Sequence, residues 1–357
     1  MGSPEGRMSS PDGRMGSPDG RMSSPSGSLR SPSGAHLRGA SKTQVVLAFA
    51  AVYVLWGSTY LAIRIGDETI PPFLLAGLRH TIAGLLLLSW LRLRGGAPGI
   101  ERRHWRSAAV IGALMLLGGN GLVTWAEKRV PSGLAALIVA SVPIWMTLLH
   151  GLQTRRRPHG IVLLGLGLCV GGLAFLVLPA GGGVASNHVD GLGAMALLSA
   201  ALFWAIGSLY SRTAPLPSST LLATAMEMVC GGAILLATST VFGEWRTVSL
   251  AAVSSRSVLA LAYLIVAGSL LGFTAYVFLL SATTPARVST YAFVNPVVAV
   301  FFGWAIAGEA VTLRTALSAL LIVGAVAIII RYGGSRDRES IAREDAPAPP
   351  ERAEKSA

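Results

Sequence analysis

Ten apolar blocks of about 20 residues fill most of the chain and constrain its fold more than any other feature. A helix of about 20 residues spans a hydrocarbon core roughly 30 Å thick. Only 13% of all residues are charged, about half the share of a soluble globular protein. We therefore predict an all-α polytopic membrane protein with ten transmembrane helices, near 45–65, 73–91, 107–126, 133–152, 160–179, 191–211, 220–242, 257–280, 286–308 and 313–332.

Basic residues between the blocks predict the orientation of the chain. Most loop Lys and Arg fall on one side, in the N-terminal tail, the 92–106 loop, the run Arg155–Arg157, Arg212 and the C-terminal tail. The positive-inside rule then places both termini in the cytoplasm, which requires an even number of crossings. Orientation therefore explains the net charge of +12 without a nucleic-acid partner.

The two ends of the chain differ from the blocks in composition. Residues 1–43 are rich in Gly, Ser, Pro and Arg and open with a degenerate seven-residue repeat. Each copy contains Pro and Gly, which excludes a coiled coil. Residues 333–357 are charged and rich in Pro and Ala. We predict that both tails are disordered, and we expect no signal peptide because no apolar stretch precedes residue 45.

The apolar region contains an internal repeat. Trp56–Tyr60 in the first block resembles Trp204–Tyr210 in the sixth. Two prolines near the fourth block recur near the ninth, as Pro131 with Pro143 and Pro285 with Pro296. These matches predict two five-helix repeats, 44–180 and 190–332. Because five is odd, the repeats insert in opposite senses, an arrangement typical of secondary transporters.

Several longer motifs are distributed over the two halves: Leu55–Gly66 (LWGSTYLAIRIG), Gly119–Glu127 (GNGLVTWAE), Pro131–Ala136 (PSGLAA), Phe203–Arg212 (FWAIGSLYSR), Ser289–Val300 (STYAFVNPVVAV) and Gly308-Glu309. Together they resemble the drug/metabolite transporter superfamily, specifically tandem EamA-domain proteins and among them the YedA-like exporters. The resemblance covers most of residues 45–330. It implies a ten-helix exporter of small molecules, amino acids or metabolites, with a central cavity between the halves.

Two charged residues lie deep inside predicted helices, where each costs about 2.5–3.5 kcal/mol by insertion scales. Glu227 shares a face with small and polar residues, so it can exchange a proton or hold a cationic substrate. It is the candidate for proton coupling. Arg79 can attract an anionic group or satisfy helix-end carbonyls. The structural alternative for both is an ion pair with each other. His80, next to Arg79, is expected to be packed or hydrogen-bonded.

Asn120, Thr124 and Glu127 form one polar stripe on the third block. Flanking glycines predict a break there whose carbonyls face a cavity. Glu127, beside Lys128 and Arg129, is expected to be a solvated charge at the membrane edge. In the ninth block, Pro296 frees a carbonyl one turn back, so we expect its neighbours Tyr291 and Asn295 to line the pathway.

Aromatic and hydroxyl side chains share faces of the first and sixth blocks. Either they pack the helices or they line the cavity, and the residues concerned are Trp56, Ser58, Tyr60, Trp204 and Ser208. Two small-residue pairs, Gly167 with Gly171 and Gly268 with Gly272, predict helix packing.

The leading prediction is a secondary-active transporter of the plasma or inner membrane that exports small metabolites, amino acids or drugs by alternating access. Motifs of metalloproteases, serine hydrolases and nucleotide-binding loops do not occur in the sequence, so we expect no enzyme activity, cofactor or metal. An intramembrane lipid-modifying enzyme and a passive channel are the alternatives. The expected partners are a small-molecule substrate and the lipid bilayer. The sequence leaves the oligomeric state open.

Overall fold

The computed structural model describes Gly2 and residues 41–95, 99–155, 160–178, 190–249, 251–283 and 285–333. The two predicted disordered tails lie outside these ranges, apart from Gly2, 41–43 and 333. Every regular element in the described part is helical. Nine helices there are long and apolar enough to cross a membrane, and a further apolar helix, Tyr291–Ala307, has 17 residues. The protein is thus an all-helical multi-pass membrane protein.

The first half begins with α1 (Lys42–Gly66) and α2 (Pro72–Leu93). A third long helix follows, made of α3 (Arg102–Ile111), the π-helix η1 (Gly112–Gly121) and α4 (Leu122–Glu127). The half ends with α5 (Ser132–Val139), α6 (Val142–Thr154) and α7 (Gly160–Val177).

The second half begins with α8 (Gly191–Ser211), α9 (Thr220–Val241) and the short α10 (Glu244–Thr247). Its long interrupted helix comprises α11 (Ser255–Tyr263), the π-helix η2 (Leu264–Leu271) and α12 (Gly272–Ala282). The remaining helices are α13 (Pro285–Val288), α14 (Tyr291–Ala307) and α15 (Leu313–Gly333).

The irregular segments recur in corresponding helices of the two halves. A π-helical stretch widens the third helix of each half, at η1 and η2. The next helix is interrupted in both halves, between α5 and α6 and between α13 and α14. The blocks predicted at 133–152 and 286–308 are helical, and each contains one short interruption. Pro143 cannot donate an amide hydrogen bond at the first interruption, and Thr290 Oγ1 donates to the Arg287 carbonyl at the second.

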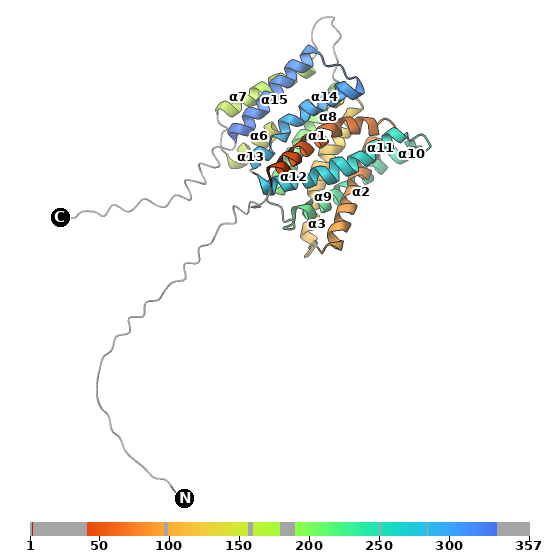
Figure 1. Ribbon diagram of the computed structural model, residues 1–357, viewed down its shortest axis with the longest axis vertical. Helices are drawn as coiled ribbons and strands as arrows, with labels where there is room; N and C mark the ends of the chain where they lie inside the picture. Colours follow the sequence, from red (N-terminus) through yellow and green to blue (C-terminus); the bar gives the residue numbers. More distant parts are fainter. Residues whose placement is uncertain are drawn as a thin grey trace, which may run out of the picture. The chain divides into compact units, whose positions relative to one another are not determined.

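Equivalent helices of the two halves make equivalent packing contacts (Figure 1). α2 packs against α9, and α7 packs against α15. α1 packs on α14 and on the segment α11–η2–α12, while α8 packs on α5, α6 and the segment α3–η1–α4. These contacts of one half thus have counterparts in the other. Since five crossings bring a chain to the opposite side of a membrane, the two repeats are inverted relative to each other.

Glycines allow the closest of these approaches. A Cβ at Gly268 would lie 2.9 Å from Thr59, and Gly272 abuts Trp56, so the predicted packing role of this pair is confirmed. The same prediction for Gly167 and Gly171 is wrong, because a Cβ at either would meet nothing within 4 Å. The α7 glycines that face α15 are Gly165 and Gly172. These two glycines are seven residues apart, so both the helix face and the spacing of four that we predicted for α7 were wrong.

Candidate functional site

A cavity of about 1190 Å³ lies between the two halves. α1, α2, η1, α6 and α7 contribute to its wall from the first half, and α8, α9, α12, α14 and α15 contribute from the second. Both repeats therefore build the site. Its volume slightly exceeds the usual range for pockets that hold drug-sized molecules.

Most candidate residues from the sequence line this cavity: Trp56, Tyr60, Arg79, Asn120, Trp204, Ser208, Glu227, Tyr291 and Asn295. Two do not. Ser58 Oγ lies 2.6 Å from the Tyr263 hydroxyl and also donates to the Leu55 carbonyl. Thr124 is buried and donates to the Asn120 carbonyl. The neighbouring Thr59, and not Ser58, lines the cavity from α1.

An aromatic wall forms one side of the cavity. Trp56 lies with its ring centroid 5.2–5.4 Å from the rings of Phe273, Tyr276 and Tyr291. The Trp56 indole Nε1 donates to the Gly268 carbonyl at 3.1 Å, which fixes the orientation of its ring. Such a wall suits flat apolar groups, and its ring faces attract cations.

Two charged side chains reach the cavity from the facing helices α2 and α9. Glu227 on α9 is half-buried. Arg79 on α2 is only 5% exposed; its Nε donates to Ser269 Oγ at 3.1 Å, and its Nη1 has no hydrogen-bond partner within the described residues. The ion pair between Arg79 and Glu227, which was the structural alternative for both residues, is not formed among the described residues. Hence Glu227 faces the cavity with its charge uncompensated by Arg79.

His80 also lies in the wall, and its Nδ1 is 2.8 Å from the Ala76 carbonyl. This confirms the expectation of a hydrogen-bonded histidine. Within the described ranges, no three His, Cys, Asp or Glu side chains lie close enough together to hold a metal ion.

The glycine-rich segment of the third helix does not break, contrary to the sequence prediction. It continues as the π-helix η1, and its glycines receive bulky neighbours: a Cβ at Gly118 would lie 2.7 Å from Phe203, and one at Gly119 would lie 2.9 Å from Trp204. The fourth helix of each half is also irregular where it meets the cavity. Val139 with Pro143, and Ala292 with Pro296, all line the wall, and neither proline has an N–H to donate to the carbonyl four residues before it.

The cavity extends to one end of the bundle. Its lining includes residues at four helix termini on that side: Thr154, Arg212, Thr220 and Tyr332. The opposite helix termini, among the described residues, contribute nothing to the lining. These are the turn after α1, the end of α4, the start of α5 and the end of α14, and we call this side the closed end.

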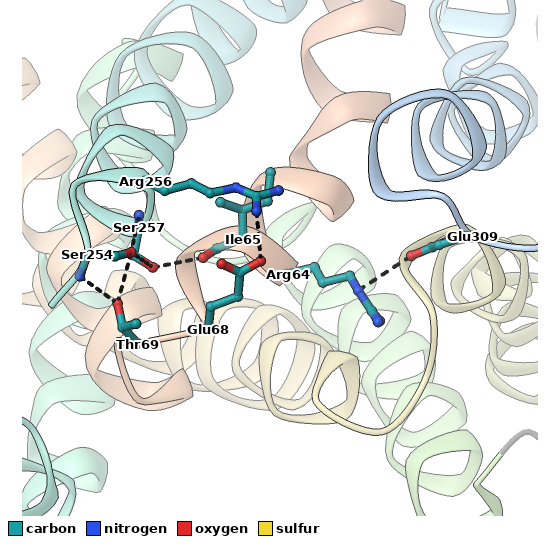
Figure 2. A network of polar contacts seen from close by, with 8 residues as sticks. All are labelled: Arg64, Ile65, Glu68, Thr69, Ser254, Arg256, Ser257 and Glu309. Atoms are coloured by element: carbon teal, nitrogen blue, oxygen red, sulfur yellow. Dashed lines mark hydrogen bonds and ion pairs between the residues drawn. The ribbon is translucent and has the colours of Figure 1, made fainter. Parts of the chain in front are cut away.

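A polar network joins the two halves at the closed end (Figure 2). Arg64 at the end of α1 points toward Glu309 after α14, with 3.6 Å between Nε and Oε1. Arg256 pairs with Glu68 at 3.7 Å. Ser257 Oγ donates to the Ile65 carbonyl at 2.9 Å, so α11 is held against the end of α1.

Two carboxylates of the second half cap helices of the first half. Glu309 accepts from the Ser132 amide at 2.7 Å, the Ser132 hydroxyl at 2.8 Å and the Gly133 amide at 3.0 Å. Glu244 accepts from the Phe73 and Leu74 amides at 3.2 and 2.8 Å. Both capped helices follow a proline that supplies no side-chain cap. A carboxylate at a helix N-terminus satisfies free N–H groups and the helix dipole.

Two further carboxyls are buried at the closed end. Glu127 is 2% exposed and neither carboxyl oxygen has a hydrogen-bond partner among the described residues. The prediction of a solvated charge is therefore wrong, because the ends of neighbouring helices cover the end of α4. Asp67 is 4% exposed and lies 3.5 Å from Lys128 Nζ. Burial raises the pKa of Asp67 to about 8, although Lys128 opposes the shift.

Some functional positions were not predicted. Phe273 and Tyr276 line the cavity from α12, and Met146 and Thr147 line it from α6. The internal repeat could have indicated the α12 positions. The segment α11–η2–α12 corresponds to α3–η1–α4, the helix that contains the predicted candidate Asn120. The sequence singled out Glu309 only as part of the motif Gly308-Glu309. That motif does not indicate that Glu309 caps α5.

Comparison with known proteins identifies the family. Residues 43–178 and 191–331 each match the EamA-like transporter family. The chain belongs to this family. It is therefore a membrane transporter rather than an enzyme, and its two matches correspond to the two structural halves.

Individual relatives agree with this assignment. An uncharacterized inner membrane transporter of Escherichia coli K12, YedA, is 39% identical over 79% of this chain and 89% of its own length. The uncharacterized transporter YoaV of Bacillus subtilis is 27% identical over 78% of this chain and 94% of its own. A solved crystal structure with 21% identity covers 80% of this chain and 97% of its own at a TM-score of 0.56, which supports the fold alone.

Proposed function

We propose that this EamA-family protein is a secondary-active transporter of the inner membrane that exports small organic molecules by alternating access. The observation that carries the proposal is the cavity between the two repeats, which reaches one end of the bundle and is sealed at the other. Inverted repeats with a shared central site are the architecture that alternates access in this way. The name of the E. coli relative supports the inner membrane as the location.

Charge supports a cytoplasmic position for the open end. The basic loops that contain Arg94, Arg103, Arg155 and Arg212 lie there. By the positive-inside rule this side faces the cytoplasm. The structure would then represent the inward-open state, ready to accept substrate from inside the cell.

The wall chemistry favours a substrate with an apolar or aromatic body and a cationic group. The aromatic wall around Trp56 provides apolar surface, and Glu227 provides negative charge. Arg79 is mostly covered and donates to Ser269, so a highly anionic substrate fits poorly. Amino acids, metabolites or drugs of suitable charge remain within this class.

Glu227 is the proposed coupling residue in the cavity, where it would hold a proton or the substrate's cation in turn. Glu227→Gln should reduce export driven by a pH gradient in proteoliposomes by at least about tenfold, because the amide can do neither. Glu101→Gln is the matched control, since Glu101 is exposed and pairs with neighbouring Arg103 outside the cavity. Unchanged coupling in Glu227→Gln would overturn the role of this residue.

The same proteoliposomes separate a transporter from a passive channel. An alternating-access protein shows accelerated exchange when unlabelled substrate is present on the opposite side, whereas a channel does not. The sealed end of the cavity supports the first outcome.

A further inference from the structure

Glu127 is a buried carboxyl with little compensation for a negative charge. It ends α4, just behind the cavity floor formed by Tyr60, Asn120 and Val123. Both of its oxygens are buried and lack hydrogen-bond partners. A carboxylate buried without a partner is strongly destabilised relative to the neutral acid. The proposed role of Glu227 does not involve this second carboxyl.

The charged groups around Glu127 are already engaged. Arg64 on α1 pairs with Glu309 at 3.6 Å, and Lys128 pairs with Asp67 at 3.5 Å. Arg79 on α2 is an electrostatic neighbour of Glu127, but it forms no ion pair with it and donates to Ser269.

The remaining elements that pack on α4 offer no compensation. α5, α8 and η1 carry no acidic or basic residue. Tyr60 on α1 is a neutral neighbour. Arg129, next in the chain, lies over the Trp125 ring, 4.1 Å from its centroid. Asp67 and Glu309, both acidic, also act on Glu127 and disfavour a further negative charge.

We infer that Glu127 is a proton-binding site that couples protonation to closure of the closed end, so that a neutral Glu127 permits this end to seal and its ionisation opens it. The proton passes to water that enters as the helix ends separate. This inference rests on the proposed alternating access, but it concerns a different carboxyl from the one that faces the cavity.

Accessibility of a buried cysteine tests the inference without any substrate. Val130 is fully buried at the closed end, so Val130→Cys is introduced into the full chain after Cys169→Ala and Cys230→Ala. The maleimide labelling rate in nanodiscs is divided by the rate for free cysteine at the same pH, because the reactive thiolate fraction itself rises with pH. This relative labelling should rise about tenfold or more between about pH 5 and pH 9, because ionised Glu127 disfavours the sealed state. Adding Glu127→Gln should leave the relative labelling low and nearly independent of pH.

Three further variants make the result decisive. Asp67→Asn and Glu227→Gln should each retain the pH dependence, and its loss in Asp67→Asn would assign the switch to Asp67 and overturn the inference. If Glu127→Gln fails to reach the membrane, Glu127→Asp must shift the labelling midpoint. A labelling profile that is flat in the parent chain, or unchanged in the Glu127 variants, also overturns the inference. Failure of export with intact pH-dependent labelling would count against the proposed function alone.

Discussion

Glu309 joins the two repeats through one carboxylate. It accepts three hydrogen bonds from the start of α5 and lies within ion-pair distance of Arg64 on α1. Hydrogen bonds to a charged group contribute about 1.5–3 kcal/mol each when the partner would otherwise stay buried and unpaired. A single side chain therefore stabilises the sealed end by bridging three helices.

Replacing this residue should open the closed end. Glu309→Ala leaves the Ser132 and Gly133 amides without an acceptor, which should disfavour the sealed state by about 2 kcal/mol, or roughly 30-fold in the ratio of sealed to open forms. Maleimide labelling of the Val130→Cys chain measures this ratio.

Glu68→Ala is the appropriate comparison, because the Glu68–Arg256 pair is about half exposed on both sides. Exposed pairs contribute about 0–1 kcal/mol, so labelling should change little. Equal labelling of both variants would contradict a specific role for Glu309.

Individual residues were predictable where the reason was local. Nine of the candidate positions line the cavity, because a polar or aromatic residue inside an apolar helix usually faces protein or water. Ser58 and Thr124 differ because a hydroxyl can satisfy itself on a carbonyl of its own helix. Glu127 was misplaced because its burial depends on the ends of helices distant in sequence.

At the scale of helices, glycine sets how closely α2 and α9 approach. A Cβ at Gly232 would lie 2.5 Å from the Thr81 backbone nitrogen, and one at Gly84 would lie 2.8 Å from the Val229 backbone nitrogen. Backbone atoms cannot move aside as a flexible side chain can. This contact between equivalent helices of the two repeats therefore requires glycine.

Gly232→Ala should lower thermal stability in detergent, by about 1–3 kcal/mol, because the added methyl group forces the helices apart. Gly167→Ala is the control: a Cβ there meets nothing within 4 Å, and alanine favours a helix over glycine by up to about 1 kcal/mol. Equal melting temperatures of the two variants would show that this contact does not limit the packing.

The π-helices η1 and η2 could not be predicted from the sequence. A run of glycines predicts a weak point in a helix, but whether the helix breaks or widens depends on what packs against it. Phe203 and Trp204 fill the space that η1 opens, so the helix remains continuous. The proline interruptions were easier to expect, since a missing N–H acts within its own helix.

Across the whole molecule, charge is divided unequally between the two ends. Because successive helices run in opposite directions, alternate connections lie at the same end of the bundle. Six of the eight acidic residues between 44 and 332 lie at the closed end: Asp67, Glu68, Glu127, Asp190, Glu244 and Glu309. The open end has Glu101 and many arginines. The closed end can thus pair its own charges, whereas the open end repels itself, which favours the conformation seen here.

The orientation of the chain is open to a direct test. A green fluorescent protein fused to the C-terminus should fluoresce, and alkaline phosphatase at the same position should be inactive, because the positive-inside rule predicts a cytoplasmic position for the side with the basic loops. Phosphatase fused after Gly243, at the opposite end of α9, should be active. Active phosphatase at the C-terminus would reverse the proposed direction of the cavity.

The sequence by itself determined the membrane-spanning helices, the two repeats and the family motifs. These features depend on the length and polarity of single segments. An apolar segment of about 20 residues can cross the bilayer only as a helix, because its backbone polar groups must be satisfied within the segment. The tertiary structure alone decided which end is sealed, which carboxylates cap α2 and α5, and where Glu127 lies. Those features arise from contacts between helices that are far apart in the sequence, such as Ser132 with Glu309, and no local pattern records them.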